Sequence, residues 1–208
     1  MKRIAKLYSL LLLLLALQSC ESDDDITPQV QWEKIEFADQ GPIYSIHGSL
    51  EDGLLLGTLR GVIKVTDNGK TSKEVLRVDT PITNLIKDGD VITAVTNIKN
   101  YSSRDGGETW HDSDKTYSPF HNREVYDSKG IIYHHVALNN GELGTPSLIM
   151  RSSDRGTNWE NIFPHKRNVY SMYLDNTDRL YLGTSGSEWD GQSFTAISNA
   201  AVLYYMKK

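Results

Sequence analysis

SRDGGETW at residues 103–110 and SSDRGTNW at residues 152–159 share the pattern S-x-D-x-G-x-x-W. A degraded third copy, TDNGKT at residues 66–71, keeps the aspartate, the glycine and a threonine but lacks the serine and the tryptophan. The aspartates lie at positions 67, 105 and 154, so the copies are 38 and 49 residues apart. Repeats at spacings of about 20 to 50 residues are typical of proteins that set one small structural unit beside another.

A tight turn between two strands explains the residue types in this pattern. The aspartate side chain accepts hydrogen bonds from the backbone of the turn, and glycine adopts the left-handed conformation that the turn needs. The tryptophan then packs the hairpin against its neighbour. The pattern therefore predicts a β-hairpin at each copy, with the aspartate in a structural role.

The two complete copies resemble the Asp-box (BNR) motif of sialidase-like β-propellers, and residues 103–110 satisfy its full S-x-D-x-G-x-T-W form. The resemblance implies that the motif joins the third and fourth strands of a propeller blade, on the face opposite the usual ligand site. It therefore implies structural rather than catalytic roles for the motif residues Ser103, Asp105, Gly107, Trp110, Ser152, Asp154, Gly156 and Trp159.

A second repeat marks another pair of strands. IYSI at 43–46 is followed by LLLGT at 54–58, and 126 residues later VYSM at 169–172 is followed by LYLGT at 180–184. Since 126 is three times 42, this repeat brackets three units of blade size. Short apolar runs separated by turns predict an all-β fold. We predict antiparallel four-stranded units at residues 43–78, 82–113, 121–163 and 169–206.

The fourth unit ends on its third strand, AVLYY at residues 201–205. The missing strand is found near the other end of the chain, where QWEKI at 31–35 matches NWENI at 158–162. We therefore predict a β-propeller of four blades closed by the N-terminal strand, as a ring without an open edge. The alternative is a fragment, or part of a larger ring completed by a second chain.

The N-terminal segment has the layout of a secretory signal peptide. Lys2, Arg3 and Lys6 precede an apolar run at residues 7–17, and a small residue lies directly before Cys20. The segment resembles bacterial lipoprotein signals. The resemblance implies that Cys20 carries acyl chains, among them palmitate, and that these chains attach the protein to a membrane. The alternative is an ordinary signal peptide with an incidental cysteine.

The predicted domain organisation is a signal peptide at 1–19, an acidic tether at 20–29 and a propeller at 30–208. ESDDD at residues 21–25 resembles the surface-export signal of Bacteroidetes lipoproteins, and a solvated tether is the alternative. We therefore favour the outer membrane or the cell surface over the inner membrane. Removal of residues 1–19 leaves 19 of the 22 Lys and Arg against 27 Asp and Glu, a net charge of −8, which argues against nucleic-acid binding.

Loops between the second and third strands of a blade, and between successive blades, form the ligand face in the propellers that this chain resembles. We expect them at 59–61, 79–81, 97–100, 114–120, 138–147, 164–168 and 185–199. Two of them, 138–147 and 185–199, are long, and long loops on a rigid scaffold are where function concentrates. The candidates for gripping a glycan or another polar ligand are Arg60, Tyr117, His121, Arg123, His165, Arg167, Glu188, Trp189 and Asp190. For each of them the alternative is a surface side chain or a wedge between blades.

The catalytic pattern of sialidases is absent. That family uses an arginine triad, a tyrosine nucleophile activated by glutamate, and an aspartic acid, but residues 41–46, where the first arginine is expected, read GPIYSI. Another kind of glycosidase would need two carboxylates roughly 5 to 10 Å apart. Only Glu142, Glu188 and Asp190 in the two long loops could supply such a pair.

No metal or cofactor site is expected. His134 and His135 are adjacent in a predicted strand, so their side chains point to opposite faces and cannot share a metal. The leading hypothesis is a lipid-anchored, non-catalytic, extracytoplasmic binding module for a glycan or a protein partner. A sialidase-like glycoside hydrolase and an assembly factor for a membrane complex are the alternatives, so enzymatic activity stays open at this point.

Overall fold

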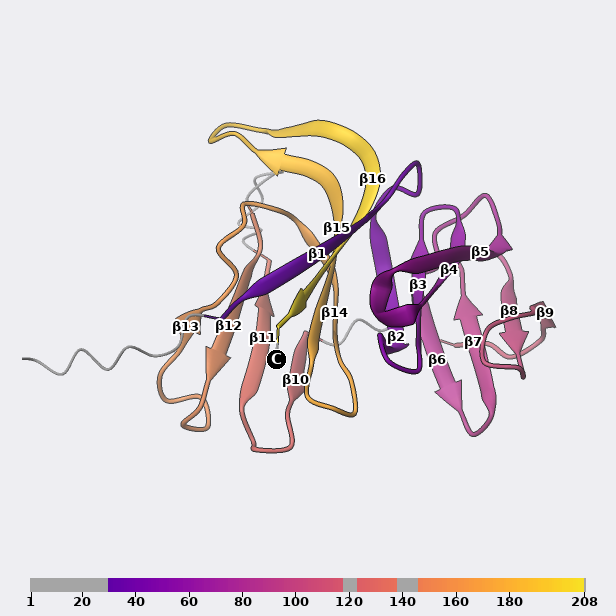
Figure 1. Ribbon diagram of the computed structural model, residues 1–208, viewed down its shortest axis with the longest axis horizontal. Helices are drawn as coiled ribbons and strands as arrows, with labels where there is room; N and C mark the ends of the chain where they lie inside the picture. Colours follow the sequence, from indigo (N-terminus) through magenta and orange to yellow (C-terminus); the bar gives the residue numbers. More distant parts are fainter. Residues whose placement is uncertain (1–29, 118–122, 138–145, 208) are drawn as a thin grey trace, which may run out of the picture.

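The computed structural model describes residues 30–117, 123–137 and 146–207, which form four antiparallel sheets of four strands each (Figure 1). Blade 1 consists of β2 (Ile43–Ser49), β3 (Gly53–Thr58), β4 (Gly61–Thr66) and β5 (Thr71–Arg77), and blade 2 of β6 (Asn84–Asp88), β7 (Val91–Val95), β8 (Asn100–Ser103) and β9 (His111–Ser113). Blade 3 consists of β10 (Glu124–Tyr126), β11 (Ile132–Val136), β12 (Leu148–Ser152) and β13 (Glu160–Asn161), and blade 4 of β14 (Val169–Leu174), β15 (Leu180–Trp189), β16 (Phe194–Met206) and β1 (Trp32–Phe37).

The all-β fold and the four propeller blades predicted from the repeats are confirmed. Apart from a short 3-10 turn, η1 at Asp67–Gly69, the described residues contain no helix, and hence none that is long and apolar enough to cross a membrane. The signal segment, the tether and the lipidation residue Cys20 lie outside the described residues.

The N-terminal strand completes the last blade, as the match between residues 31–35 and 158–162 predicts. β1 runs antiparallel to β16, with Trp32 opposite Met206 and Phe37 opposite Ala201. The indole Nε1 of Trp32 donates to the carbonyl of Ile162 in blade 3 at 2.8 Å. The tryptophan therefore fixes this strand both to its own sheet and to the neighbouring blade.

The second sequence repeat forms a lock between successive blades. Ser45 Oγ of blade 1 donates to the carbonyl of Ile82 at 3.0 Å, and Ser171 Oγ of blade 4 donates to the carbonyl of Ile43 at 2.9 Å. A Cβ added to the glycine opposite each serine, Gly57 or Gly183, would lie only 2.1 or 2.2 Å from that hydroxyl oxygen. Glycine is therefore required because the serine occupies the space of a side chain.

Three hydrophobic clusters join the blades in series. Leu56 and Leu203 belong to the cluster between blades 1 and 4, Phe163 and Tyr204 to that between blades 3 and 4, and the third joins blades 1 and 2. Figure 1 shows the resulting order, with blade 3 at the left, then blades 4 and 1, and blade 2 at the right. No such cluster among the described residues joins blade 2 to blade 3.

The composition of blade 3 gives a physical reason for this difference. Val125 and Tyr133 pack toward blade 4, so their neighbours Glu124 and His134 face the other way, where the Nδ1 of His134 lies 3.3 Å from the carboxylate of Glu124 and both side chains are 39% exposed. The corresponding face of blade 1 carries the cross-strand pair Ile46 and Leu56, which is buried against blade 4. Polar side chains stand on this face of blade 3 where blade 1 has apolar ones, so the face lacks the residues that would build an apolar core.

Candidate functional site

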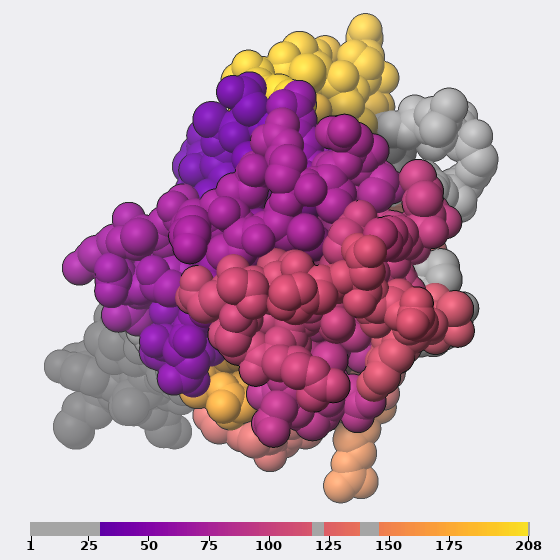
Figure 2. All heavy atoms as spheres, turned by 90° about the vertical axis from the view of Figure 1, so that its right-hand side faces the viewer, coloured from indigo at the N-terminus to yellow at the C-terminus, as the bar shows by residue number. Residues whose placement is uncertain are grey.

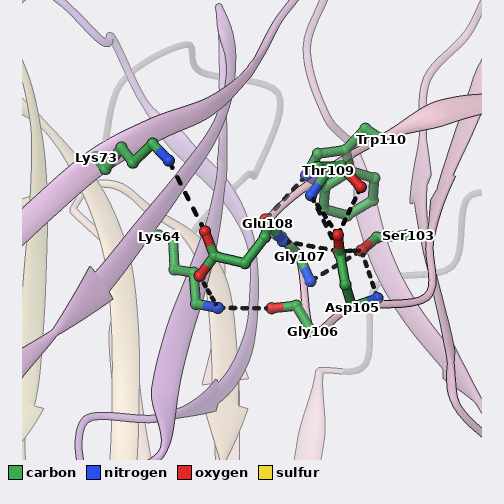
Figure 3. A network of polar contacts seen from close by, with 9 residues as sticks. All are labelled: Lys64, Lys73, Ser103, Asp105, Gly106, Gly107, Glu108, Thr109 and Trp110. Carbon is green, nitrogen blue, oxygen red and sulfur yellow. Dashed lines mark hydrogen bonds and ion pairs between the residues drawn. The ribbon is translucent and has the colours of Figure 1, made fainter.

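The Ser103–Trp110 turn, here named the first aspartate turn, joins β8 and β9 (Figure 3). Asp105 accepts hydrogen bonds from the backbone N–H groups of Glu108 and Thr109 at 3.0 and 2.9 Å, and from the hydroxyl of Ser103 at 2.7 Å. Hydrogen bonds from Thr109, followed by that from Ser103, hold the pKa of Asp105 well below its ordinary value. The carboxylate caps its own turn and stays ionised at neutral pH, so it is unsuited to proton transfer.

The second aspartate turn, Ser152–Trp159, repeats this arrangement between β12 and β13. Asp154 accepts from the backbone and side-chain amides of Asn158 at 2.8 and 2.6 Å and from the hydroxyl of Ser152 at 2.8 Å. The hydrogen bonds from Asn158 are the largest cause that lowers the pKa of Asp154 to about 2. Both complete copies of the motif thus place their aspartate in a turn.

The first aspartate turn also contacts blade 1. Lys64 of β4 donates to the carboxylate of Glu108 at 2.6 Å and to the carbonyl of Gly106 at 3.0 Å, as Figure 3 shows. Gly107 has a positive φ of 87°, and a Cβ there would lie 2.7 Å from Leu55. The first aspartate turn is therefore occupied by contacts with blade 1.

The opposite end carries the turns β3–β4 and β7–β8 and the long hairpin β15–β16, and we call it the loop face. Pairing of β14 with β15 reaches only Thr184, and pairing of β1 with β16 reaches only Ala201, so residues 186–199 extend beyond the sheet. This projecting hairpin forms the top of the molecule in Figures 1 and 2. The sequence interpretation of 185–199 as a loop is wrong, because Glu188 pairs with Thr195 and Trp189 with Phe194 as cross-strand neighbours.

Arg167 supports the base of the projecting hairpin. Its side chain is 6% exposed, and its Nη1 donates to the carbonyls of Ser185 and Ser187 at 2.8 and 3.4 Å. Its Nη2 pairs with the carboxylate of Glu188, and the guanidinium lies 5.8 Å from the ring centroid of Tyr204. Both terminal nitrogens of this arginine therefore bind within the protein.

His165 is packed into the same region. Its ring lies 4.6 Å from that of Tyr204 and 5.2 Å from that of Phe163, centroid to centroid. Burial, followed by the charge of Arg167, lowers the pKa of His165. This histidine is neutral at neutral pH, and its apolar surface is used in the junction of blades 3 and 4.

The remaining sequence candidates are spread over the molecule. Arg60 is half-buried in the β3–β4 turn, Arg123 is exposed directly before β10, and His121 lies outside the described residues. Trp189 is half-buried at the tip of the projecting hairpin, 5.4 Å from Phe194. Of Arg60, Arg123 and Arg167, only Arg167 is buried, and its terminal nitrogens bind Ser185, Ser187 and Glu188.

The loop face carries apolar residues that sequence reasoning missed. Ile98 in the β7–β8 turn is 84% exposed, Ile197 on the projecting hairpin is 64% exposed, and Leu59 in the β3–β4 turn is 37% exposed. A single isoleucine or leucine in a sequence gives no signal that it lies at the surface. Only the placement of Ile197 on a strand that leaves its sheet distinguishes it from a core residue.

A cavity of about 290 Å³ lies where blades 1, 2, 3 and 4 meet. Tyr44 and Tyr170 line it with their rings edge to face at 5.5 Å, together with Asn84 and His135. Its described lining contains no aspartate, glutamate, lysine or arginine. Within the described residues there is also no cluster of His, Cys, Asp or Glu that could hold a metal.

Comparisons with known proteins give a resemblance of fold. No protein-family model matches the chain, and no curated protein matches it. Similar solved structures include YCF48 from Cyanidioschyzon merolae (14% identity, TM-score 0.34, 79% of this chain and 58% of that one) and YCF48 bound to D1 peptide (15%, 0.33, 78% and 56%). PorZ, a surface component of the type-IX secretion system of Porphyromonas gingivalis, is also similar (15%, 0.26, 68% and 23%). The chain thus spans little more than half the length of the YCF48 structures.

Proposed function

We propose that this protein is a lipid-anchored, extracytoplasmic binding module that recognises a protein partner through its loop face and has no catalytic centre of its own. The projecting hairpin carries the proposal, because it presents Trp189, Phe194 and Ile197 on a support that is buried at its base. Aromatic and aliphatic side chains on a rigid element are typical of protein interfaces.

The chemistry of the two ends of the molecule supports binding over hydrolysis. Asp105 and Asp154 are capped by hydrogen bonds, as expected if the aspartate turns are structural Asp-boxes. The terminal nitrogens of Arg167 bind Ser185, Ser187 and Glu188, and the described lining of the central cavity offers no carboxylate. A glycosidase needs a pair of carboxylates, and a sialidase-like site needs free arginines.

Photo-crosslinking tests the binding role directly. A photoreactive phenylalanine at position 197 of the full-length protein in its native cells should give a discrete adduct with a partner protein. The same residue at position 129, in the exposed β10–β11 turn at the opposite end, serves as the control and should give none. Equal labelling at both positions, or turnover of a fluorogenic sialoside that is lost on Arg123→Ala, would contradict the proposal.

The anchor is tested separately. Radioactive palmitate should label the wild-type protein and should fail to label a Cys20→Ser variant, because Cys20 is the only thiol in the chain. Labelling that persists in the variant would remove the lipid anchor from the proposed function and leave the binding role untouched.

A further inference from the structure

A second cavity, of about 360 Å³, lies where blades 1, 2 and 4 meet, at the end of the molecule that carries the aspartate turns. Its walls come from strands of all three blades and from the turns β2–β3, β8–β9 and β14–β15. The volume falls within the range of small-molecule pockets, roughly 300 to 1,000 Å³. This end is opposite the loop face, so the proposed recognition of a protein partner makes no use of the cavity.

Strand register places a histidine of blade 1 and a lysine of blade 2 on the faces that these two blades turn toward each other. His47 is the cross-strand neighbour of Leu55, and Lys87 is that of Ile92. Leu55 and Ile92 are both buried in the core between the two blades, and cross-strand neighbours share one face of a sheet. His47 and Lys87 therefore lie at the end of this core, where the four residues together form part of the cavity wall.

The charge of Lys87 is not balanced by a direct partner. Within the described residues, no hydrogen bond or ion pair engages its ammonium group, whereas Lys64 and Lys73 near the same end both pair with Glu108. Burial, followed by the charge of Lys87, lowers the pKa of His47, so the histidine is neutral at neutral pH. Lys87 thus brings the only positive charge to the described lining of the cavity.

Two uncharged donors border the same space. The hydroxyl of Tyr173 accepts the backbone N–H of Gly48 at 3.3 Å, which leaves its own proton for a ligand. The ring of His47 lies 5.9 Å from that of Tyr173, and among the described residues no hydrogen bond engages its ring nitrogens. Since a neutral imidazole carries one N–H, an ammonium, an imidazole and a phenol all offer donors to one cavity.

Asp52 in the β2–β3 turn is the only carboxylate of the described lining, and its own turn holds it. The hydroxyl of Ser49 donates to the carboxylate at 3.3 Å, and the backbone N–H of Asp52 donates to Ser49 Oγ at 3.0 Å. The side chain is exposed and forms no ion pair with Lys87. Asp52 therefore leaves the lysine available to a ligand.

We infer that this cavity binds the anionic group, a phosphate or a carboxylate, of a small ligand, with Lys87 as the counter-charge and His47 and Tyr173 as hydrogen-bond donors. Hydrogen bonds between an ammonium group and such an anion are charge-assisted and stronger than neutral ones. Leu55 and Ile92 offer an apolar wall to the remainder of the ligand. The inference goes beyond the proposed function and does not depend on it, because no residue of the loop face lines the cavity.

Titration of the full-length protein in non-ionic detergent micelles with inorganic phosphate, and separately with succinate, tests the inference at constant ionic strength. The ring signals of His47 in the NMR spectrum, assigned by their loss in His47→Gln, should shift to saturation with at least one anion. The pKa of His47 should rise in the bound state, because the anion offsets the charge of Lys87. The anion that saturates at the lower concentration identifies the group that the cavity prefers.

Three variants give the test its direction. Lys87→Met should weaken anion binding by about tenfold or more, because a charged donor is lost. The matched control Lys70→Met removes the same charge from an exposed position outside the lining and should leave binding unchanged. Asp52→Asn should strengthen binding by about twofold to threefold, because it removes a like charge from the lining.

The opposite results would overturn the inference. No saturable shift with either anion, equal weakening by Lys87→Met and Lys70→Met, or weaker binding in Asp52→Asn would each exclude an anion site at this cavity. All three positions are exposed, so the variants should keep the wild-type circular dichroism spectrum. Photo-crosslinking at position 197 should be the same in all of them, so a failure here leaves the loop face untouched.

Discussion

Replacement of Arg167 by alanine distinguishes a supporting residue from a ligand-binding one. The substitution leaves the buried carbonyl of Ser185 without its charged donor, removes a cation from the face of Tyr204 and frees Glu188. Loss of a hydrogen bond from a charged group costs about 2 kcal/mol. The contact with the aromatic face contributes about 1 kcal/mol.

The ion pair with Glu188 adds little to this total. The glutamate side chain is 50% exposed and regains water when its partner is removed, so the expected contribution is below about 1 kcal/mol. The free energy of unfolding should therefore fall by about 3 kcal/mol in Arg167→Ala. Arg167→Lys keeps the charge but lacks the planar fork that reaches two carbonyls and a carboxylate, and it should lose about half as much, or about 1.5 kcal/mol.

Urea denaturation of the wild type, Arg167→Ala, Arg167→Lys and Arg123→Ala measures these differences. Arg123 is exposed, so its alanine variant should stay within about 0.5 kcal/mol of the wild type. A loss below about 1 kcal/mol in Arg167→Ala, with an unchanged dependence on urea, would refute the supporting role. A ligand-binding role would then be the better explanation of Arg167.

Two further variants probe the lock between blades and the aspartate turns. Gly57→Ala would set a methyl group 2.1 Å from Ser45 Oγ and should destabilise the protein by about 2 to 3 kcal/mol in thermal denaturation. The added Ser45→Ala change should restore only part of the loss, since Ile82 also lies 2.8 Å from the new Cβ. No effect of Gly57→Ala would mean that the serine can leave its site freely. Because the pKa of Asp154 is lowered to about 2 in the folded state from 3.8, its stabilising contribution is present above about pH 4 and is lost as the pH falls toward 2. The urea midpoint of Asp154→Asn should therefore fall less than that of the wild type over this pH range, and parallel curves would contradict the capping role.

The blades could be predicted from the repeats because each repeated residue makes a specific hydrogen bond or close contact. The predicted units at 43–78, 82–113 and 169–206 match the strands of blades 1, 2 and 4 within a few residues, and Trp32 marks the strand that completes blade 4. Serine and glycine recur at an offset of 126 residues because one donates between blades and the other leaves room for it. The aspartate turns are satisfied within a few residues of chain, and each serine lies opposite its glycine in one hairpin, so a sequence pattern indicates both.

The candidate site was less predictable because its properties depend on distant parts of the chain. Arg167 reads as a loop arginine, and only the folded structure shows that its acceptors come from residues 18 and 20 positions later. The junction of blades 2 and 3 did have a signal in the sequence. Glu124 and His134 fall in short strands where the other units carry apolar residues, and an alignment of the units by strand face would have indicated a junction without an apolar core.

The hairpins at the two ends of the molecule differ in length and in how they are held. At the aspartate turns, each hairpin is short, its carboxylate is satisfied by its own backbone, and in blade 2 it is bound to blade 1 through Lys64. At the loop face, the β15–β16 hairpin extends beyond both of its neighbouring strands, and Ile197–Ala200 form a bulge opposite Gly186. The base of this hairpin is held by Arg167, and Trp189, Phe194 and Ile197 lie beyond the sheet, which is the arrangement expected if a partner protein covers them.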